Sequence, residues 1–510
     1  VDVWCGEPKV EVRPGKSRGT LQVTVADDAP PGVCWIRLYN AEGASKPVPF
    51  VVGTLPEALE KEPNDEPGKP QTFDNSSLLV NGRLAKNGDV DHFAVPLKRG
   101  QTLVAALTAN EVLGSPMDGV LQVLSPEGFV LADVNDSRGL DPQIAFAVPR
   151  DGTYLVRVFA FPATPDSGIR FSGGANYVYR LTLTAGGFAD HALPPAVSLK
   201  DPTPVRLVGW NIPTAAERVE ARPGQPADSL LVHAPGVANP VPVRVEPHAV
   251  RPEQEPNGPD RPQEVEAPVT VGGHIDPPGD VDVYQFPARK GQKLTVQVEA
   301  RALGSPLAPT LQVRDAGGKP VRQEREGGRR GRGGRGRDRE VSDPELSFTA
   351  PADGTYRAEV SDLYEHGGLR YVYRLRVAPT EPDFALTVAA DSFSATAGQE
   401  LEIPVTVTRR DGFDGVIELS VEGLPEGAEV VGGPVKADAR AKSVNLKLRA
   451  DKPFGGPVRI LGRTAREPMI ERSARATLAE QQTDTDSLWL TVRPAKEPAK
   501  GPEKEPAKKK

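Results

Sequence analysis

The sequence predicts an all-β protein: a multidomain array of β-sandwich or jelly-roll-like modules and Ig-like sandwiches. Its 510 residues include 51 glycines and 53 prolines, which separate short apolar runs as turn residues do in all-β modules. The commonest runs alternate Val, Leu and Thr, as at 103–107 and 294–298, which suits half-buried strands. In addition, five sequence blocks occur twice in the same order, offset by about 190 to 200 residues. That offset far exceeds the short periods of solenoid repeats.

The duplicated blocks define one module that is present in two copies. The blocks of the first copy are Glu62-Pro63-Asn64-Asp65, Gly88-Asp89-Val90-Asp91, Leu113-Gly114-Ser115-Pro116, Asp151-Gly152-Thr153-Tyr154 and Tyr177-Val178-Tyr179-Arg180-Leu181. The blocks of the second copy are Glu255-Pro256-Asn257, Gly279-Asp280-Val281-Asp282, Leu303-Gly304-Ser305-Pro306, Asp353-Gly354-Thr355-Tyr356 and Tyr371-Val372-Tyr373-Arg374-Leu375. An array of duplicated β modules is typical of proteins that bind or space other molecules, because a single active site needs no second copy.

Strand-sized runs and turn-rich boundaries divide the chain into five β domains and a tail. We expect a small Ig-like domain, truncated at its start, at 1–56, and a second small Ig-like domain at 186–250. The two copies of the large module occupy 57–185 and 251–380, and a closing Ig-like sandwich occupies 381–494. The Lys/Pro/Glu-rich residues 495–510 cannot bury apolar surface, so a disordered tail is expected there.

Composition excludes several classes of protein. A net charge of −7 argues against a nucleic-acid binder. No apolar stretch approaches the roughly 18 residues of a membrane span. The first residue is Val1, with no initiator Met and no signal peptide, which indicates a processed or trimmed product.

The two cysteines lie in the N-terminal segment. Cys5 and Cys34 could form a disulfide between two strands in an oxidising compartment, or remain two buried thiols. A zinc site is not expected, because zinc requires four ligands and no Cys/His cluster accompanies this pair.

Acidic side chains at the start of each copy are the candidate metal ligands. Carboxylates that alternate in an extended segment point the same way, and a second pair at the Gly-Asp-x-Asp turn could complete an oxygen cage for calcium. The candidate ligands are Glu60, Glu62, Asn64, Asp65, Asp89 and Asp91 in the first copy, and Glu253, Glu255, Asn257, Asp280 and Asp282 in the second. Gly258 replaces Asp65 in the second copy and removes a carboxylate there. The alternative is ordinary turn chemistry, in which Asn and Asp cap backbone groups.

The repeated blocks resemble the bacterial pre-peptidase C-terminal domain, a secreted β-sandwich found beside peptidases and in large surface proteins. The similarity covers about half the chain and extends to the collagen-binding domains of bacterial collagenases. In those domains the corresponding acidic segment and Asp-x-Asp turn bind calcium, so the resemblance implies calcium at the residues named above. Collagen binding is not implied, because no aromatic binding surface can be matched.

The second copy carries an Arg/Gly-rich insertion at 322–340. The distance from Leu303 to Asp353 exceeds that from Leu113 to Asp151 by 12 residues, which places the insertion in a loop. Such tracts can bind RNA or acidic polymers, but a solvated loop expansion is favoured. If the loop has a partner, an anionic polysaccharide is favoured over nucleic acid.

Catalytic patterns are lacking in the sequence. The six histidines show no zinc-peptidase spacing, and no Gly-x-Ser-x-Gly elbow or phosphate-binding glycine loop occurs. We therefore expect a non-enzymatic, monomeric protein that is secreted, periplasmic or on the cell surface. Its partner would be an extracellular polymer or a surface protein. The alternative is the accessory C-terminal region of a larger secreted peptidase or other hydrolase.

Overall fold

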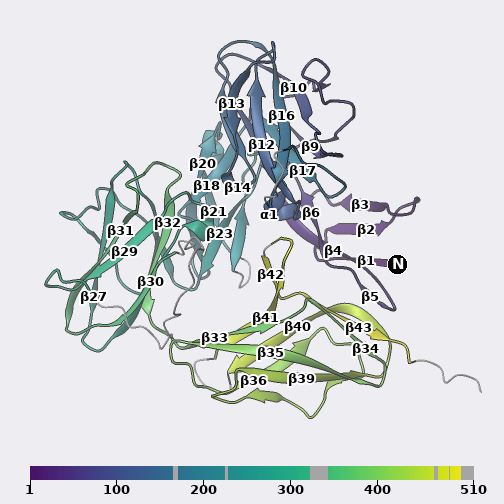
Figure 1. Cartoon of the computed structure of the whole chain (residues 1–510). Helices are drawn as coiled ribbons and strands as arrows, with labels where there is room; N and C mark the ends of the chain where they lie inside the picture. The colour runs from purple at the N-terminus through teal and green to yellow at the C-terminus, as the bar shows by residue number, and fades with distance from the viewer. Residues whose placement is uncertain (165–169, 224–227, 322–342, 465–468, 482, 496–510) are drawn as a thin grey trace, which may run out of the picture. The chain divides into compact units, whose positions relative to one another are not determined.

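The computed structural model describes residues 1–164, 170–223, 228–321, 343–464, 469–481 and 483–495. Strands dominate this part of the chain, and its helices are the four-residue α1 (Asn110–Leu113) and two short 3-10 turns, η1 (Thr214–Ala216) and η2 (Arg301–Leu303). The all-β multidomain fold class is thereby confirmed (Figure 1). The chain forms two compact units. One contains residues 30–33 and 51–381, and the other contains residues 1–29 and 34–50 together with the described residues from Pro382 onward.

The first copy of the module folds as two facing five-stranded sheets. The first sheet has the order β13-β12-β16-β10-β8, with β8 Gln71–Thr72, β10 Asp91–Leu97, β12 Met117–Leu124, β13 Val130–Val134 and β16 Gly152–Pro162. The second has the order β15-β11-β17-β9-β7, with β7 Glu57–Leu59, β9 Leu78–Arg83, β11 Thr102–Thr108, β15 Gln143–Ala147 and β17 Val178–Thr184. Strand β14 (Ser137–Leu140) lies between β13 and β15 in the chain. Alternate residues of the two sheets form one apolar core that includes Phe93, Val156 and Leu181.

The second copy repeats this arrangement. One sheet has the order β25-β27-β31-β29, with β25 Gln263–Glu264, β27 Val281–Ala288, β29 Pro309–Arg314 and β31 Gly354–Asp362. The other has the order β24-β26-β32-β28-β30, with β24 Ala249–Pro252, β26 Val269–His274, β28 Lys293–Glu299, β30 Glu345–Thr349 and β32 Val372–Pro379. The register is shared as well: Asp91 pairs with Val158 across β10 and β16, and Asp282 pairs with Val360 across β27 and β31. Both copies therefore bring the same blocks to the same corner.

A small two-sheet domain connects the two copies. One sheet has the order β18-β20-β21, with β18 Phe188–Leu193, β20 Thr203–Trp210 and β21 Arg218–Ala221. The other has the order β19-β23-β22, with β19 Ala196–Ser198, β22 Ser229–Val232 and β23 Val241–Glu246. The core between them consists of small side chains, among them Val197, Val205 and Val243.

Buried ion pairs attach the small domain to both sandwiches. Asp190 on β18 accepts from Arg138 Nη2 of the first sandwich at 2.9 Å and from Arg370 Nε of the second at 3.2 Å. Arg374 of the second sandwich is paired with Glu246 on β23 and with Glu299 on β28. Asp190, Glu246 and Arg374 are largely buried, whereas the side chains of Arg138 and Arg370 are 34% exposed. Removing one partner of a buried pair would leave an uncompensated charge, which is strongly destabilising.

The C-terminal part of the other unit is a β-sandwich built around its own large core. Its main path runs β34-β43-β40-β41-β33-β35-β39-β37, while β36, β38 and β42 pair at its side. The strands are β33 Asp383–Val388, β34 Ser392–Thr396, β35 Glu400–Arg410, β36 Ile417–Glu422, β37 Ala428–Val430, β38 Val435–Ala437, β39 Ser443–Ala450, β40 Phe454–Thr464, β41 Glu471–Leu478, β42 Thr483–Thr485 and β43 Leu488–Arg493. Inward-facing residues of β35 alternate with exposed ones, as expected for a sheet with one buried face.

The N-terminal segment packs against this sandwich. It forms one sheet of β1 Asp2–Cys5, β4 Gly32–Asn40, β5 Gly43–Ala44 and β6 Val48–Val52, and a β-hairpin of β2 Val10–Pro14 and β3 Leu21–Val25. Trp4 and Tyr39 lie against Trp489 of β43, with ring centroids 5.9 and 4.9 Å away. Arg37, which is 2% exposed, pairs with Asp391 at 2.7 Å. The N-terminal residues thus share a unit with partners more than 350 residues away in the sequence.

Two expectations fall on residues outside the described ranges. These are the Arg/Gly-rich loop at 322–340 and all but the first residue of the tail at 495–510. The expected domain boundaries stay predictions. The structure adds the grouping of the N-terminal segment with the residues from Pro382 onward.

Candidate metal sites

The Glu-Pro-Asn segment and the Asp-x-Asp turn meet at one corner of each sandwich. In the first copy the backbone N–H of His92 donates to the carbonyl of Asn64 at 3.1 Å. In the second copy the N–H of Val283 donates to the carbonyl of Asn257 at 2.7 Å. These bonds hold the segment beside the first residues of β10 and β27. The Glu62–Pro63 and Glu255–Pro256 peptide bonds are both cis.

The first copy contains two groups of three carboxylates that share Glu62. One consists of Glu60, Glu62 and Asp91, and the other of Glu62, Asp65 and Asp89; within each group one oxygen per side chain lies within 4.8 Å of the others. Like charges at this separation repel each other strongly unless a proton or a cation lies between them.

Several oxygens of this corner are buried and lack a hydrogen-bond partner in the described structure. They include Oδ1 of Asp89, whose residue is fully buried, and Oε1 of Glu60. Their second oxygens are bound: Asp89 Oδ2 accepts from the N–H of Ala85, and Glu60 Oε2 accepts from the N–H of Arg83 at 2.6 Å. Each carboxylate is thus oriented by one oxygen and directs the other inward. A buried acceptor without a donor is costly, and a proton, a water molecule or a cation at this corner would each relieve that cost.

The amide of Asn64 completes the first corner. It is 1% exposed, and its end lies 3.2 Å from Glu62 Oε2 and 3.1 Å from Asp91 Oδ1, where its nitrogen can donate to both carboxylates. A half-turn of the amide would present its oxygen to the same place. The one side chain can therefore hydrogen bond to the carboxylates or act as a cation ligand.

The second copy contains one such group, formed by Glu253, Glu255 and Asp282. Oδ1 of Asp282 and Oδ1 of Asn257 are buried and lack a partner in the described structure, and both residues are 0% exposed. Asp280 stands apart: it is half-buried, and its Oδ1 accepts from the N–H of Val281 at 2.8 Å. Glu253 is also engaged by His274, through both the backbone N–H and the ring Nδ1.

Tyrosines from the opposite sheet support both corners, a role that the sequence did not predict. The hydroxyl of Tyr179 donates to Asp91, and that of Tyr373 donates to Asp282. Both tyrosines belong to the closing Tyr-Val-Tyr-Arg-Leu block, so the repetition itself carried the signal. Gly82 makes room for the first ring, because a Cβ at that position would lie 2.3 Å from Cζ of Tyr179.

Burial and mutual repulsion raise the pKa values of these carboxyls. Burial, and then the charge of Glu60, raises the pKa of Asp91 to about 9. Burial, and then the contact with Asp65, raises the pKa of Asp89 to about 6. In the second copy, burial raises the pKa of Asp282 to about 8 although the Tyr373 hydroxyl opposes the shift. A bound cation would favour the ionised forms and reverse these shifts.

The structure brings most of the predicted ligands together. In the first copy all five predicted carboxylates belong to the two groups, with Asn64 beside them; in the second, three carboxylates converge with Asn257, while Asp280 does not join the group. All the donors are hard oxygen atoms, which is the ligand type that calcium and magnesium prefer. Lys86 approaches the first corner from outside, 3.4 Å from Asp65 and 3.9 Å from Asp89.

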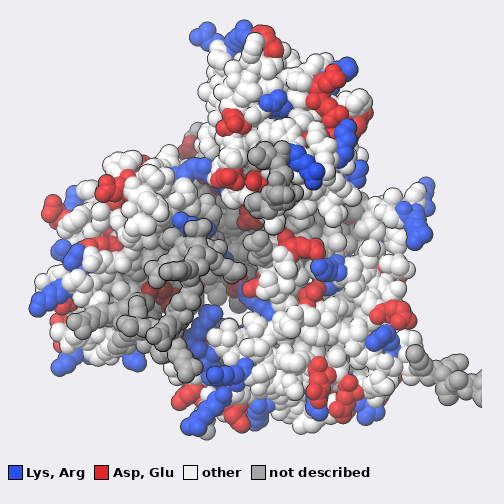
Figure 2. All heavy atoms as spheres, viewed as in Figure 1, with Lys and Arg blue, Asp and Glu red and all other residues white. Residues whose placement is uncertain are grey.

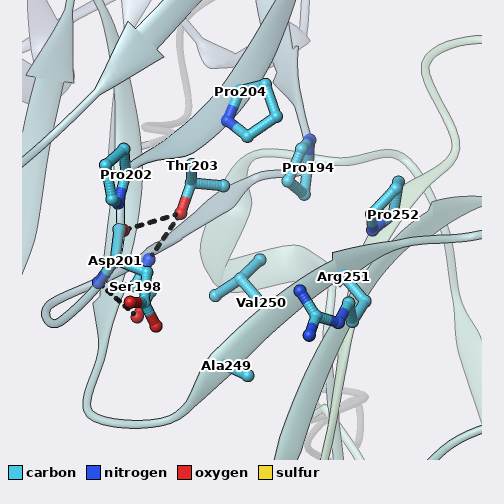
Figure 3. A pocket seen from close by; sticks show the side chains of 10 residues that line it. All are labelled: Pro194, Ser198, Asp201, Pro202, Thr203, Pro204, Ala249, Val250, Arg251 and Pro252. Atoms are coloured by element: carbon cyan, nitrogen blue, oxygen red, sulfur yellow. Dashed lines mark hydrogen bonds between the residues drawn. The ribbon is translucent and has the colours of Figure 1, made fainter.

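A shallow pocket beside the small domain offers little binding chemistry (Figure 3). Four prolines, among them Pro194 and Pro252, line much of it. The hydroxyl of Thr203 accepts from the N–H of Ser198 at 2.9 Å, and Ser198 Oγ in turn accepts from the N–H groups of Lys200 and Asp201. These polar groups close a turn, so we assign no ligand to the pocket.

The histidines make local structural contacts. His92 Nδ1 lies 3.1 Å from the carbonyl of Asn64, His191 lies beside Asp190, and His233 lies 2.9 Å from the carbonyl of Val237. In the described ranges, the three groups of potential metal ligands are entirely acidic. No helix in the described residues has the length and apolar character needed to cross a membrane. Figure 2 shows acidic and basic side chains interspersed over the face that it draws.

Comparison with known proteins identifies the duplicated module. The model of the family "Bacterial pre-peptidase C-terminal domain" matches residues 89–160 and 280–362, so the chain contains two domains of this type, as the sequence blocks predicted. A curated relative, a probable subtilase-type serine protease of Deinococcus radiodurans, is 33% identical over 99 residues. That match covers 19% of this chain and 14% of the relative.

Solved structures show weaker likeness. The match with a DUF4785 family protein of Legionella pneumophila covers 44% of this chain and 64% of that protein's chain, at 10% identity and a TM-score of 0.14. The match with domains 1–6 of the surface layer protein SbsC covers 75% of this chain and 54% of that protein's chain, at 9% identity and a TM-score of 0.15.

Proposed function

We propose that this is a secreted, non-catalytic binding or spacer protein in which calcium stabilises the entry to each large sandwich. The two pre-peptidase C-terminal-type domains are the repeated binding or spacing elements. The small domain holds them through the buried pairs of Asp190 and Arg374. A partner would be an extracellular polymer or another surface protein, and the protein would act as a monomer on the cell surface, in the periplasm or outside the cell.

One observation supports calcium above all others. Both copies direct fully buried oxygens that lack a hydrogen bond into the same corner: Asp89 Oδ1 in the first, which lies 3.9 Å from the ammonium of Lys86, and Asp282 Oδ1 and Asn257 Oδ1 in the second. Turn chemistry, the alternative reading of these residues, would leave such oxygens bonded to backbone N–H groups. Calcium requires six to eight oxygen ligands and accepts carboxylates, amide oxygens and waters together. Magnesium demands a stricter octahedron and keeps more of its own water, so it suits this mixed corner less well.

The two corners differ in capacity. The first offers two overlapping carboxylate groups through Asp65 and Asp89, whereas Gly258 in the second copy leaves one. We therefore propose that the first copy binds calcium more tightly than the second and has room for a further ion.

Calorimetric melting with and without calcium tests the proposal. At a free calcium concentration of about 100 times Kd, a site present only in the folded state adds about 2.7 kcal/mol of stability, so the chelator should lower the Tm by several degrees. Asp89→Asn should reduce this response, whereas Glu66→Gln, at an exposed residue paired with Lys69, should retain it. Identical melting curves in calcium and in chelator would rule out the calcium proposal.

A second candidate function rests on the curated relative. Because the matched region corresponds to 14% of a probable serine protease, this chain could be the accessory C-terminal region of a larger secreted hydrolase. A peptidase domain encoded upstream in the same reading frame would favour this role. Assays of the purified 510-residue chain on protein and polysaccharide substrates test the non-catalytic proposal, and turnover by the chain itself would overturn it.

A further inference from the structure

The N-terminal sheet brings the two cysteines together. Cys5 is the last residue of β1 and is paired with Ile36 of β4 in an antiparallel register. Cys34 lies two residues before Ile36, so its side chain emerges on the same face of the sheet. Cys5 lies near enough to Cys34 to raise the pKa of the Cys34 thiol. Cys34 is 6% exposed, whereas Cys5 is half-buried, and both are reduced in this structure.

A covalent bond between Cys5 and Cys34 would strengthen the attachment of β1 to its sheet. Among the described residues β1 pairs only with β4, over four residues, so it is a short edge strand. The opposite face of the same strand carries Trp4, which packs edge-on against Trp489 at 5.9 Å. If β1 separated from β4, the contact of Trp4 with the C-terminal sandwich would be lost as well.

We propose that Cys5 and Cys34 are the two halves of a structural disulfide that fixes β1 to β4 and thereby holds Trp4 against Trp489. The bond forms by exchange with a small disulfide such as oxidised glutathione. The more accessible Cys5 thiolate attacks the donor, forming a mixed disulfide and releasing one donor thiolate. The Cys34 thiol then loses its proton, and its sulfur attacks Cys5 Sγ and releases the second donor thiolate. Two protein thiols are oxidised, one donor disulfide is reduced to two thiols, and the two protons pass to the released thiolates.

Burial supports the assignment of a structural bond over a reactive site. Burial, and then the neighbouring Cys5, raises the pKa of Cys34 to about 12. Such a thiol is a poor nucleophile toward solutes, because the thiolate is the reactive form. The expected partner of Cys34 is Cys5, whose side chain lies on the same face of the sheet.

Peptide mapping of the full chain tests the proposal. After incubation in oxidised glutathione and alkylation without reduction, trypsin should yield residues 1–9 linked to residues 19–37, about 2 Da lighter than the sum of the separate peptides. Reductant should separate them. Glutathione adducts, or two freely alkylated thiols, would overturn the proposal.

Melting provides an independent readout with a matched control. The bond closes a loop of about 30 residues, so the oxidised chain should melt about 5 to 10 °C above the reduced chain in the transition of its unit. Cys5→Ser, at the half-buried position, should fold normally and show the same Tm with and without reductant. An oxidised wild-type chain that melts no higher than its reduced form would contradict a structural role for the bond.

Discussion

Replacing Asp282 by asparagine should reverse the sign of its effect on stability according to whether calcium is present. The Asp282→Asn side chain has the same shape but carries no charge. Asp282 is fully buried, one oxygen accepts from Tyr373, and the other has no partner in the described structure. Without calcium, the negative charge of the buried Asp282 carboxylate lowers the stability of the folded chain. With calcium, the same carboxylate is a ligand of the ion.

The magnitude follows from the pKa of this carboxyl. Its folded-state pKa is about 8, against a usual value of 3.8. Because the folded pKa of this acid is raised, its stability contribution is greatest below the usual pKa and is lost as the pH rises toward about 8. At pH 7 the unfolded chain is ionised while the folded chain must hold a proton. At 1.36 kcal/mol per pKa unit this costs on the order of 4 kcal/mol, which asparagine avoids.

Calorimetric melting at pH 7 provides the assay. In chelator, Asp282→Asn should melt several degrees above the wild type; in millimolar calcium, the wild type should gain stability while the variant should gain only through the first copy. Asp260→Asn, an exposed neighbour of the site, serves as the matched control. A variant that melts below the wild type in chelator would refute the argument from buried charge. An undiminished calcium response would refute the role of Asp282 as a ligand.

Three further predictions follow from the same contacts. The apparent calcium affinity of the second corner should fall about tenfold per pH unit below pH 8, since binding must displace the proton of Asp282; titration calorimetry at pH 6, 7 and 8 checks this, and a flat profile would contradict it. Gly82→Ala should lower the free energy of unfolding by about 1 to 3 kcal/mol, because the added methyl group overlaps a buried tyrosine ring; denaturant unfolding measures this, and an unchanged midpoint would count against the tight packing. Asp190→Asn should weaken the attachment of the small domain. Burial raises the pKa of Asp190, but its hydrogen bond to a neighbouring histidine and two guanidiniums lower it overall. The stability it contributes is therefore present above about pH 4 and lost as the pH falls further, so acid titration of the wild type should show a loss that the variant lacks.

Local pattern was sufficient to predict the strands and the repeated module. The runs at 103–107 and 294–298 lie within β11 and β28, because alternation with period two depends only on neighbouring residues. The acidic corner was predicted from the same repetition. Its support by Tyr179 was not: the repeated block singles out this tyrosine, but local spacing does not show that its hydroxyl reaches Asp91 on the opposite sheet.

Long-range partners could not be predicted. Nothing in the spacing of Trp4 or Arg37 indicates that their partners are Trp489 and Asp391. Side-chain alternation specifies which face of a strand is buried, but not which distant segment covers it.

The grouping of the N-terminal residues with those from Pro382 onward has a practical consequence. Residues 51–381 separate, in the sequence, the two pieces of one compact unit. A proteolytic cut after Glu381 would therefore leave the C-terminal sandwich attached to the N-terminal residues through Trp4, Tyr39 and Arg37. Separation of the two pieces would uncover the indole of Trp489, which is now 1% exposed.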